Sequence, residues 1–168
     1  LMGLGNIYVG TGKFNDAVAN HREALRMFEA IPGTELYQAT CLMYLGYAYW
    51  STDKFNEAEA NFKEALGMLE AIDGTEIEQA KCLRKLGDVY LSTGRFNDAE
   101  ANYKKALMMY KAIPRTGIEQ AKCLMGLGIL YGIIQEEYSK ARSVLKEALE
   151  ICERYPQGTE QILSLIHI

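Results

Sequence analysis

One short stretch has residues suited to phosphate chemistry. Gly10-Thr11-Gly12-Lys13 resembles the end of the glycine-rich loop that binds nucleotide phosphates through backbone N–H groups and a lysine. That loop also needs a glycine at the position of Ile7 and a Ser or Thr at the position of Phe14. Because neither is present, we predict no phosphate site here.

The cysteines and His21 are not spaced like metal ligands or catalytic partners. Cys41, Cys82 and Cys123 recur every 41 residues, and His21 has no second His or Cys at ligand spacing. Equivalent helices of adjacent units pack no closer than about 8–10 Å, whereas a disulfide needs Cα atoms within roughly 7 Å. We therefore predict reduced, semi-buried thiols, with no metal, no cofactor and no catalytic residue. The chain is predicted not to be an enzyme.

The same 41-residue spacing extends over the whole chain. It is carried by four glycines, each preceded by Leu and followed three positions later by Tyr: Gly5, Gly46, Gly87 and Gly128. Residues 78–107 contain two apolar patterns of helical period, separated by Ser92-Thr93-Gly94. Two amphipathic helices joined by a short turn bury their apolar stripes against each other. The sequence therefore predicts an all-α protein with two helices in each unit.

Alanine and aromatic residues complete the pattern in the second helix of each unit, as in Ala58, Phe62 and Ala65. The combination L-G-x2-Y, then A-x3-F/Y-x2-A, resembles the tetratricopeptide repeat (TPR) family over nearly the whole chain. The long period is similar to that of kinesin light chains and G-protein-signalling modulators. This resemblance implies a right-handed superhelical solenoid of antiparallel helix pairs. At the aromatic position the first unit has His21 and the fourth, after one inserted residue, has Leu145.

Turn residues divide a single array, residues 1–162, into units. The predicted units are about 1–33, 34–74, 75–115 and 116–157, followed by the start of a fifth at 158–162. Thr34, Thr75 and Thr116 are placed to cap the first helices, and Thr75 with Glu78 fits a capping box. The last residues, 163–168, resemble a translation of CTG-TCT-CTT-ATA-CAC-ATC, a transposon-end sequencing adapter. We interpret them as such a translation of a fragment, with a native apolar helix as the alternative.

The recurring glycine lies in the middle of a helix, where glycine costs about 1 kcal/mol relative to alanine. It occurs four times at the same register. We predict that the paired helix packs closely against each of these glycines, because a cofactor does not explain the repetition.

Charge and hydropathy exclude two classes of partner. The net charge of −4 comes from 18 basic and 22 acidic residues that are scattered along the chain without a basic stripe. This pattern argues against nucleic acid as a partner. The longest apolar run, 123–134, is too short to span a bilayer and contains three glycines. We expect no membrane contact and a cytoplasmic location.

A second stripe on the first helices is poor in charge. In the second unit it contains Thr40, Met43, Tyr47 and Trp50, where a solvated face would carry charges. The TPR resemblance implies that this stripe lines a concave, peptide-binding groove; the alternative is packing between neighbouring units. The predicted groove residues are Asn6, Thr40, Met43, Tyr47, Trp50, Lys81, Arg84, Asp88, Leu91, Lys122, Met125 and Ile129.

These patterns predict a scaffold or adaptor that binds a peptide segment of a partner protein. The expected ligand has apolar anchors near Tyr47 and Trp50, and an acidic residue near the cations of the third and fourth units. Two alternatives stay open: a regulatory array fused to an enzyme such as an NTPase or kinase, and a structural spacer without a groove ligand. Uncapped ends, with an apolar face around Val144, Leu145 and Ile151, allow self-association.

Overall fold

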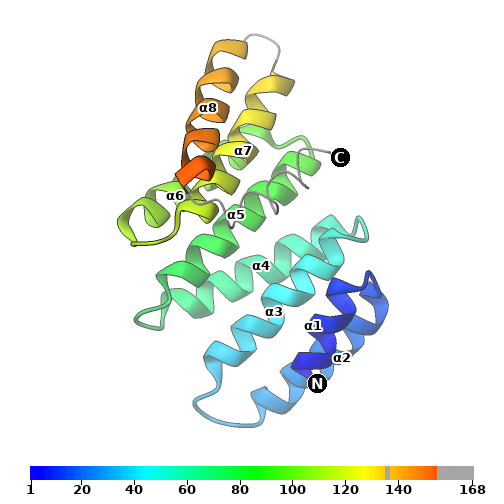
Figure 1. Ribbon diagram of the computed structural model, residues 1–168. Coiled ribbons are helices and arrows are strands. Elements are labelled where there is room, and N and C mark those ends of the chain that lie inside the picture. The colour runs from blue at the N-terminus through cyan, green and yellow to red at the C-terminus, as the bar shows by residue number, and fades with distance from the viewer. Residues whose placement is uncertain (135–136, 155–168) are drawn as a thin grey trace.

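The computed structural model describes residues 1–134 and 137–154, and in these ranges it contains eight α-helices and no strand. The predicted all-α architecture, with two helices in each unit, is confirmed (Figure 1). The helices are α1 (Met2–Gly10), α2 (Phe14–Glu29), α3 (Glu35–Trp50), α4 (Phe55–Glu70), α5 (Glu76–Ser92), α6 (Phe96–Ala112), α7 (Gly117–Ile133) and α8 (Tyr138–Arg154). None of them is long and apolar enough to cross a membrane.

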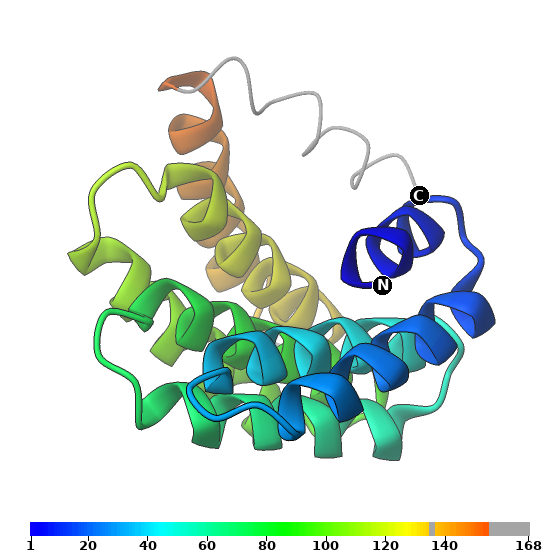
Figure 2. The same cartoon turned by 90° about the horizontal axis from the view of Figure 1, so that it is seen from below.

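The helix pairs follow one another along an arc (Figure 2). Each helix packs against the next one in the chain, and the first helices of successive units also contact one another, α1 with α3, α3 with α5 and α5 with α7. Contacts between successive second helices are weaker. The first helices therefore lie on the inner side of the curve and form its concave face.

The recurring glycines let the two helices of each pair approach closely, as predicted. In every unit the contacting side chain occupies the aromatic position of the second helix. An added Cβ would lie 2.5 Å from His21 at Gly5, 2.9 Å from Phe62 at Gly46, 2.8 Å from Tyr103 at Gly87 and 2.5 Å from Leu145 at Gly128. These distances are too short for real Cβ contacts, so the repeated glycine is a packing requirement.

His21 occupies that aromatic position as a buried, neutral ring. It is fully buried and stacks on Tyr44, with ring centroids 4.9 Å apart. Neither ring nitrogen has a hydrogen-bond partner among the described residues. Burial lowers the pKa of His21 below its ordinary value of 6.5 because desolvation disfavours the charged imidazolium.

His21→Phe is expected to remove a pH dependence of stability. Because the pKa of His21 is lowered in the folded chain, the unfolded chain binds the proton more readily below pH 6.5. The free energy of unfolding should therefore hold above that pH and fall as the pH decreases, by at most about 1.4 kcal/mol per pH unit. Urea unfolding of both proteins at neutral and mildly acidic pH measures this. Equal pH slopes in the two proteins would show that His21 does not titrate as the structure implies.

The threonines between units stabilise the preceding helix, which corrects the capping-box prediction. Thr75 is the N-cap residue of α5, but its hydroxyl makes no capping bond there. Instead Thr75 Oγ1 donates to the carbonyl of Leu69 in the last turn of α4 (2.7 Å) and to that of Ile72 just after the helix (2.9 Å). Gln79 Nε2 also donates to Leu69 O (3.2 Å). Thr34 with Gln38 and Thr116 with Gln120 repeat this arrangement. The last carbonyls of a helix lack intrahelical partners, so the side chains satisfy acceptors rather than N–H groups.

Cys41, Cys82 and Cys123 are free, buried thiols in the inter-helix packing. Burial raises the pKa of Cys41 to about 11 and that of Cys82 and Cys123 to about 12. These thiols stay protonated at neutral pH, so they pack as small apolar groups and are poor nucleophiles.

The predictions for the C-terminal part of the chain fall only partly on residues that the structure describes. Residues 155–157 of the fourth unit, the fifth unit at 158–162 and the adapter at 163–168 lie outside the described residues. On α8, Leu145 is 44 % and Leu149 57 % exposed, while Val144 and Ile151 are half-buried.

Candidate binding groove

Two neighbouring cavities lie along the concave face of the array. The first, of about 420 Å³, is lined by Val9, Thr40, Met43, Tyr44, Tyr47, Phe62, Glu78, Lys81, Arg84 and Lys85. The second, of about 400 Å³, is lined by Tyr47, Trp50, Arg84, Lys85, Asp88, Leu91, Ser92, Tyr103, Lys122, Met125, Gly126 and Ile129. Both share Tyr47, Arg84 and Lys85, so they form one groove that runs across α3, α5 and α7.

The structure brings most of the predicted groove residues together. Thr40, Met43 and Lys81 line the first cavity, Tyr47 and Arg84 line both, and Trp50, Asp88, Leu91, Lys122, Met125 and Ile129 line the second. Asn6 lines neither cavity and is exposed on α1, where Val9 reaches the groove instead.

Sequence reasoning missed Lys85 and Tyr44 as groove residues. Lys85 lines both cavities and Tyr44 lines the first. The repeat itself contains the signal, because Tyr44, Lys85 and Gly126 occupy the same position in successive units. At that position the ring of Tyr103 packs directly against Gly126, where an added Cβ would lie only 2.5 Å from the ring. Gly126 and Tyr103 both line the second cavity.

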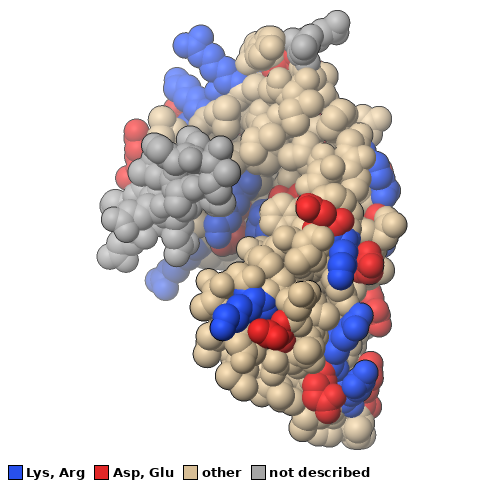
Figure 3. Space-filling model, turned by 90° about the vertical axis from the view of Figure 1, so that its right-hand side faces the viewer, with Lys and Arg blue, Asp and Glu red and all other residues tan. Residues whose placement is uncertain are grey.

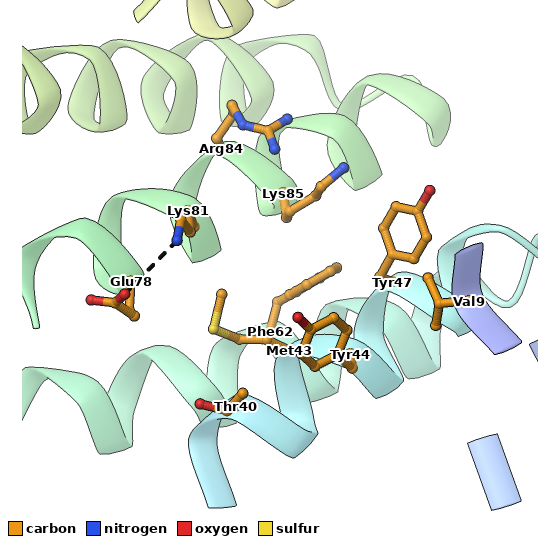
Figure 4. A pocket seen from close by; sticks show the side chains of 10 residues that line it. All are labelled: Val9, Thr40, Met43, Tyr44, Tyr47, Phe62, Glu78, Lys81, Arg84 and Lys85. Atoms are coloured by element: carbon orange, nitrogen blue, oxygen red, sulfur yellow. Dashed lines mark ion pairs between the residues drawn. The ribbon is translucent and has the colours of Figure 1, made fainter. Parts of the chain in front are cut away.

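The first cavity has an apolar side from α3 and from Phe62 of α4, and a cationic side on α5. Figure 4 shows Met43, Tyr44 and Phe62 on one side, with Arg84 and Lys85 across from them on α5. Lys81 is paired within its own helix to Glu78, at 3.8 Å. The hydroxyl of Thr40 donates to the carbonyl of Leu36 (2.7 Å), so the side chain presents mainly its methyl group.

Trp50 takes part in both the groove and the packing between units. Its ring is half-buried, lines the second cavity and packs against the central apolar cluster. Its Nε1 donates to Ser92 Oγ of the next unit at 3.2 Å. The ring of Tyr47 lies 6.0 Å from it, centroid to centroid. Trp50 therefore contributes both to the wall of the groove and to the packing between the second and third units.

Lys85, Arg84 and Asp88 form a charged cluster where the cavities meet. Lys85 Nζ lies 4.9 Å from the ring centroids of both Tyr47 and Trp50, within the range of a cation–π contact. Asp88 Oδ2 pairs with Lys85 at 3.0 Å and with Arg84 at 3.2 Å, and Tyr103 donates its hydroxyl to Asp88 Oδ1 at 2.8 Å. Burial lowers the pKa of Lys85, with Asp88 acting in the opposite direction.

The second helices carry a different kind of surface. Lys63 pairs with Glu59 at 2.6 Å, Lys104 pairs with Glu100 at 2.6 Å, and Arg95 bridges to Glu59 of the preceding unit at 2.9 Å. Figure 3 shows acidic and basic side chains alternating along one edge of the molecule, next to a broad uncharged surface. These exposed pairs keep the outer face solvated.

The composition of the groove is suited to binding a ligand. Within residues 1–134 and 137–154 no group of three or more His, Cys, Asp or Glu side chains could hold a metal ion. Its lining combines large apolar side chains with four partly buried cations, Lys81, Arg84, Lys85 and Lys122. Such a surface can recognise an apolar ligand that carries negative charge.

Comparison with known proteins places this geometry among helical repeats. The family model described as tetratricopeptide repeat matches residues 1–71 and 78–154. No curated protein gives a significant sequence match.

Several solved structures share the fold. BtubC (BKLC) from P. vanneervenii is 22 % identical, with a TM-score of 0.81 over 92 % of this chain and 63 % of BtubC. MamA is 25 % identical, with a TM-score of 0.67 over 93 % of this chain and 78 % of MamA. Aspartyl phosphate phosphatase F from Bacillus subtilis is 15 % identical, with a TM-score of 0.80 over 92 % of this chain and 40 % of the phosphatase. The chain thus spans less than two thirds of the length of BtubC and of the phosphatase.

Proposed function

Since the chain belongs to the tetratricopeptide repeat family, we propose that it is a protein-interaction scaffold that binds a peptide segment of a partner protein in its concave groove. The observation that carries the proposal is the pair of adjoining cavities, whose walls come from the first helices of consecutive units. Met43, Tyr47 and Trp50 supply apolar contacts of the kind that dominate binding energy at interfaces.

The proposed location, self-association and second candidate function rest on separate observations. Four unpaired, buried cysteines suit a reducing compartment, which favours a cytoplasmic location. The exposed Leu145 and Leu149 on α8 provide an apolar surface for self-association. A second candidate function is a regulatory array within a larger enzyme, because one similar structure is named as a phosphatase and is longer than this chain.

Selection from a phage-displayed library of random short peptides tests the groove. We expect the wild-type chain to enrich a peptide family that Ile129→Lys binds at least about tenfold more weakly, because the added charge lies at the wall of the second cavity. Met108→Lys is the matched control: Met108 is 67 % exposed on α6, Ile129 53 % exposed on α7, and Met108 lines neither cavity.

Titration of each variant with the same selected peptide, by calorimetry, gives the comparison. Equal weakening by both substitutions would place the peptide elsewhere. Failure of the wild-type chain to enrich any peptide would contradict the proposal and favour a spacer.

A further inference from the structure

The centre of the groove has two cations and one carboxylate. Arg84 and Lys85 both pair with Asp88, whose side chain is 19 % exposed, and their own side chains are 14 % and 19 % exposed. Asp88 also accepts a hydrogen bond from Tyr103, so its two oxygens serve three donors. One positive charge in this half-buried cluster is therefore not balanced by Asp88.

The other charges along the groove are balanced locally. Lys122 pairs with Glu119 at 2.9 Å and Lys81 with Glu78 at 3.8 Å, each within one helical turn. The Glu119 carboxylate also stabilises the charged form of Arg84, but Arg84, Lys85 and Lys122 still outnumber Asp88 and Glu119 by one charge where the two cavities meet. Among the described residues the Nε of Arg84 is a buried donor without an acceptor. A buried donor without an acceptor costs free energy, so the residues of the chain do not fully satisfy this guanidinium.

We propose that the peptide bound in the groove carries an internal Asp or Glu, whose carboxylate binds Arg84 and Lys85 while apolar side chains on either side of it enter the two cavities. This inference rests on the proposed function and names the chemistry of its ligand. It also moves the acidic subsite away from Lys81 and Lys122, which have carboxylate partners of their own.

The charge balance favours a carboxylate over a phosphate group. A carboxylate brings one negative charge, which matches the single unbalanced cation, whereas a phosphorylated side chain brings about two. The carboxylate is internal to the peptide because cavities lie on both sides of the cluster. A chain-terminal carboxylate would leave one of them without a side chain.

When no peptide is bound, the Asp88 carboxylate pairs with both Arg84 and Lys85. It competes with the ligand for Arg84 and Lys85, so removing its charge should strengthen binding of an acidic peptide. Asp88→Asn keeps an oxygen that can accept the hydrogen bond from Tyr103. A residue needed only for folding would show no such gain.

The test uses a peptide selected on the wild-type chain and three synthetic versions, with the acidic residue kept, replaced by Gln, or replaced by phosphoserine. On the wild-type chain we expect the Gln version to bind about tenfold more weakly and the phosphoserine version no more tightly than the original. Arg84→Met should bind the original and Gln versions with equal affinity. The remaining cation, Lys85, stays paired with Asp88 and its charge is then balanced. Lys81→Met, on the same helix, is the matched control and should preserve the tenfold difference.

Asp88→Asn should bind the acidic peptide several-fold more tightly than the wild-type chain does. Its affinity for the Gln version should equal that of the wild-type chain. The inference is overturned, with the proposed function intact, if peptides bind in the groove but the Gln version binds as well as the original. Tighter binding of the phosphoserine version would reassign the subsite to phosphate. Absence of any selected peptide would overturn both the inference and the proposed function.

Discussion

Gly87→Ala is expected to lower the free energy of unfolding by about 1–3 kcal/mol, although alanine favours helix by about 1 kcal/mol. The added methyl group would lie 2.8 Å from the ring of Tyr103. Tyr103 has no room to move away, because its ring is fully buried and also packs closely against Gly126 of the next unit. The hydroxyl of the same ring is held by Asp88. Overpacking therefore outweighs the gain in helix propensity.

Gly67→Ala is the matched control, because it changes the same residue type in the interior of α4. An added Cβ at Gly67 would meet no atom within 4 Å, and the residue is exposed. Here helix propensity alone acts, and the free energy of unfolding should rise by about 0.5–1 kcal/mol. Urea unfolding of the wild-type chain and both variants gives the two differences. Changes of the same sign would contradict the role assigned to the repeated glycine.

Trp50→Ala is expected to weaken binding of a selected peptide by about 2 kcal/mol or more, since large aromatic side chains dominate interface energies. The substitution also removes the contact with Ser92 and part of the inter-unit packing. A moderate fall in melting temperature should accompany the loss of affinity. Binding is therefore measured by calorimetry well below the transition, with helix content checked by circular dichroism.

Trp50→Phe separates the two roles of this residue. Phenylalanine keeps an apolar ring in the second cavity but cannot donate to Ser92. We expect it to retain most of the affinity of the wild-type chain. If Trp50→Ala lowered the melting temperature but bound the peptide with undiminished affinity, Trp50 would be an inter-unit packing residue and not part of the binding surface.

The features that the sequence predicted best are those set within one helix pair. The contact of Gly46 with Phe62 and of Gly87 with Tyr103 joins residues at a fixed separation in the same unit. Such packing follows from helical period and turn length alone. The prediction that these glycines receive the paired helix was therefore correct in all four units.

The features that the sequence did not predict depend on how successive units are rotated. Lys85 of the third unit reaches the rings of Tyr47 and Trp50 in the second, which local periodicity on α5 does not encode. Asn6 has the right register on α1 but lies outside both cavities. Thr75 was correctly placed before α5, yet its hydroxyl bonds to α4, because the direction of a side-chain hydrogen bond depends on the geometry of the connection.

Hydrogen–deuterium exchange with and without a selected peptide is the most direct test of the concave groove. We expect slower exchange after peptide binding in α3, α5 and α7, around Tyr47, Lys85 and Met125, whose side chains line the two cavities. Exchange in the outer helices α4, α6 and α8 should change little. Slowing confined to those outer helices, with the amides of α3, α5 and α7 unaffected, would contradict peptide binding in the concave groove.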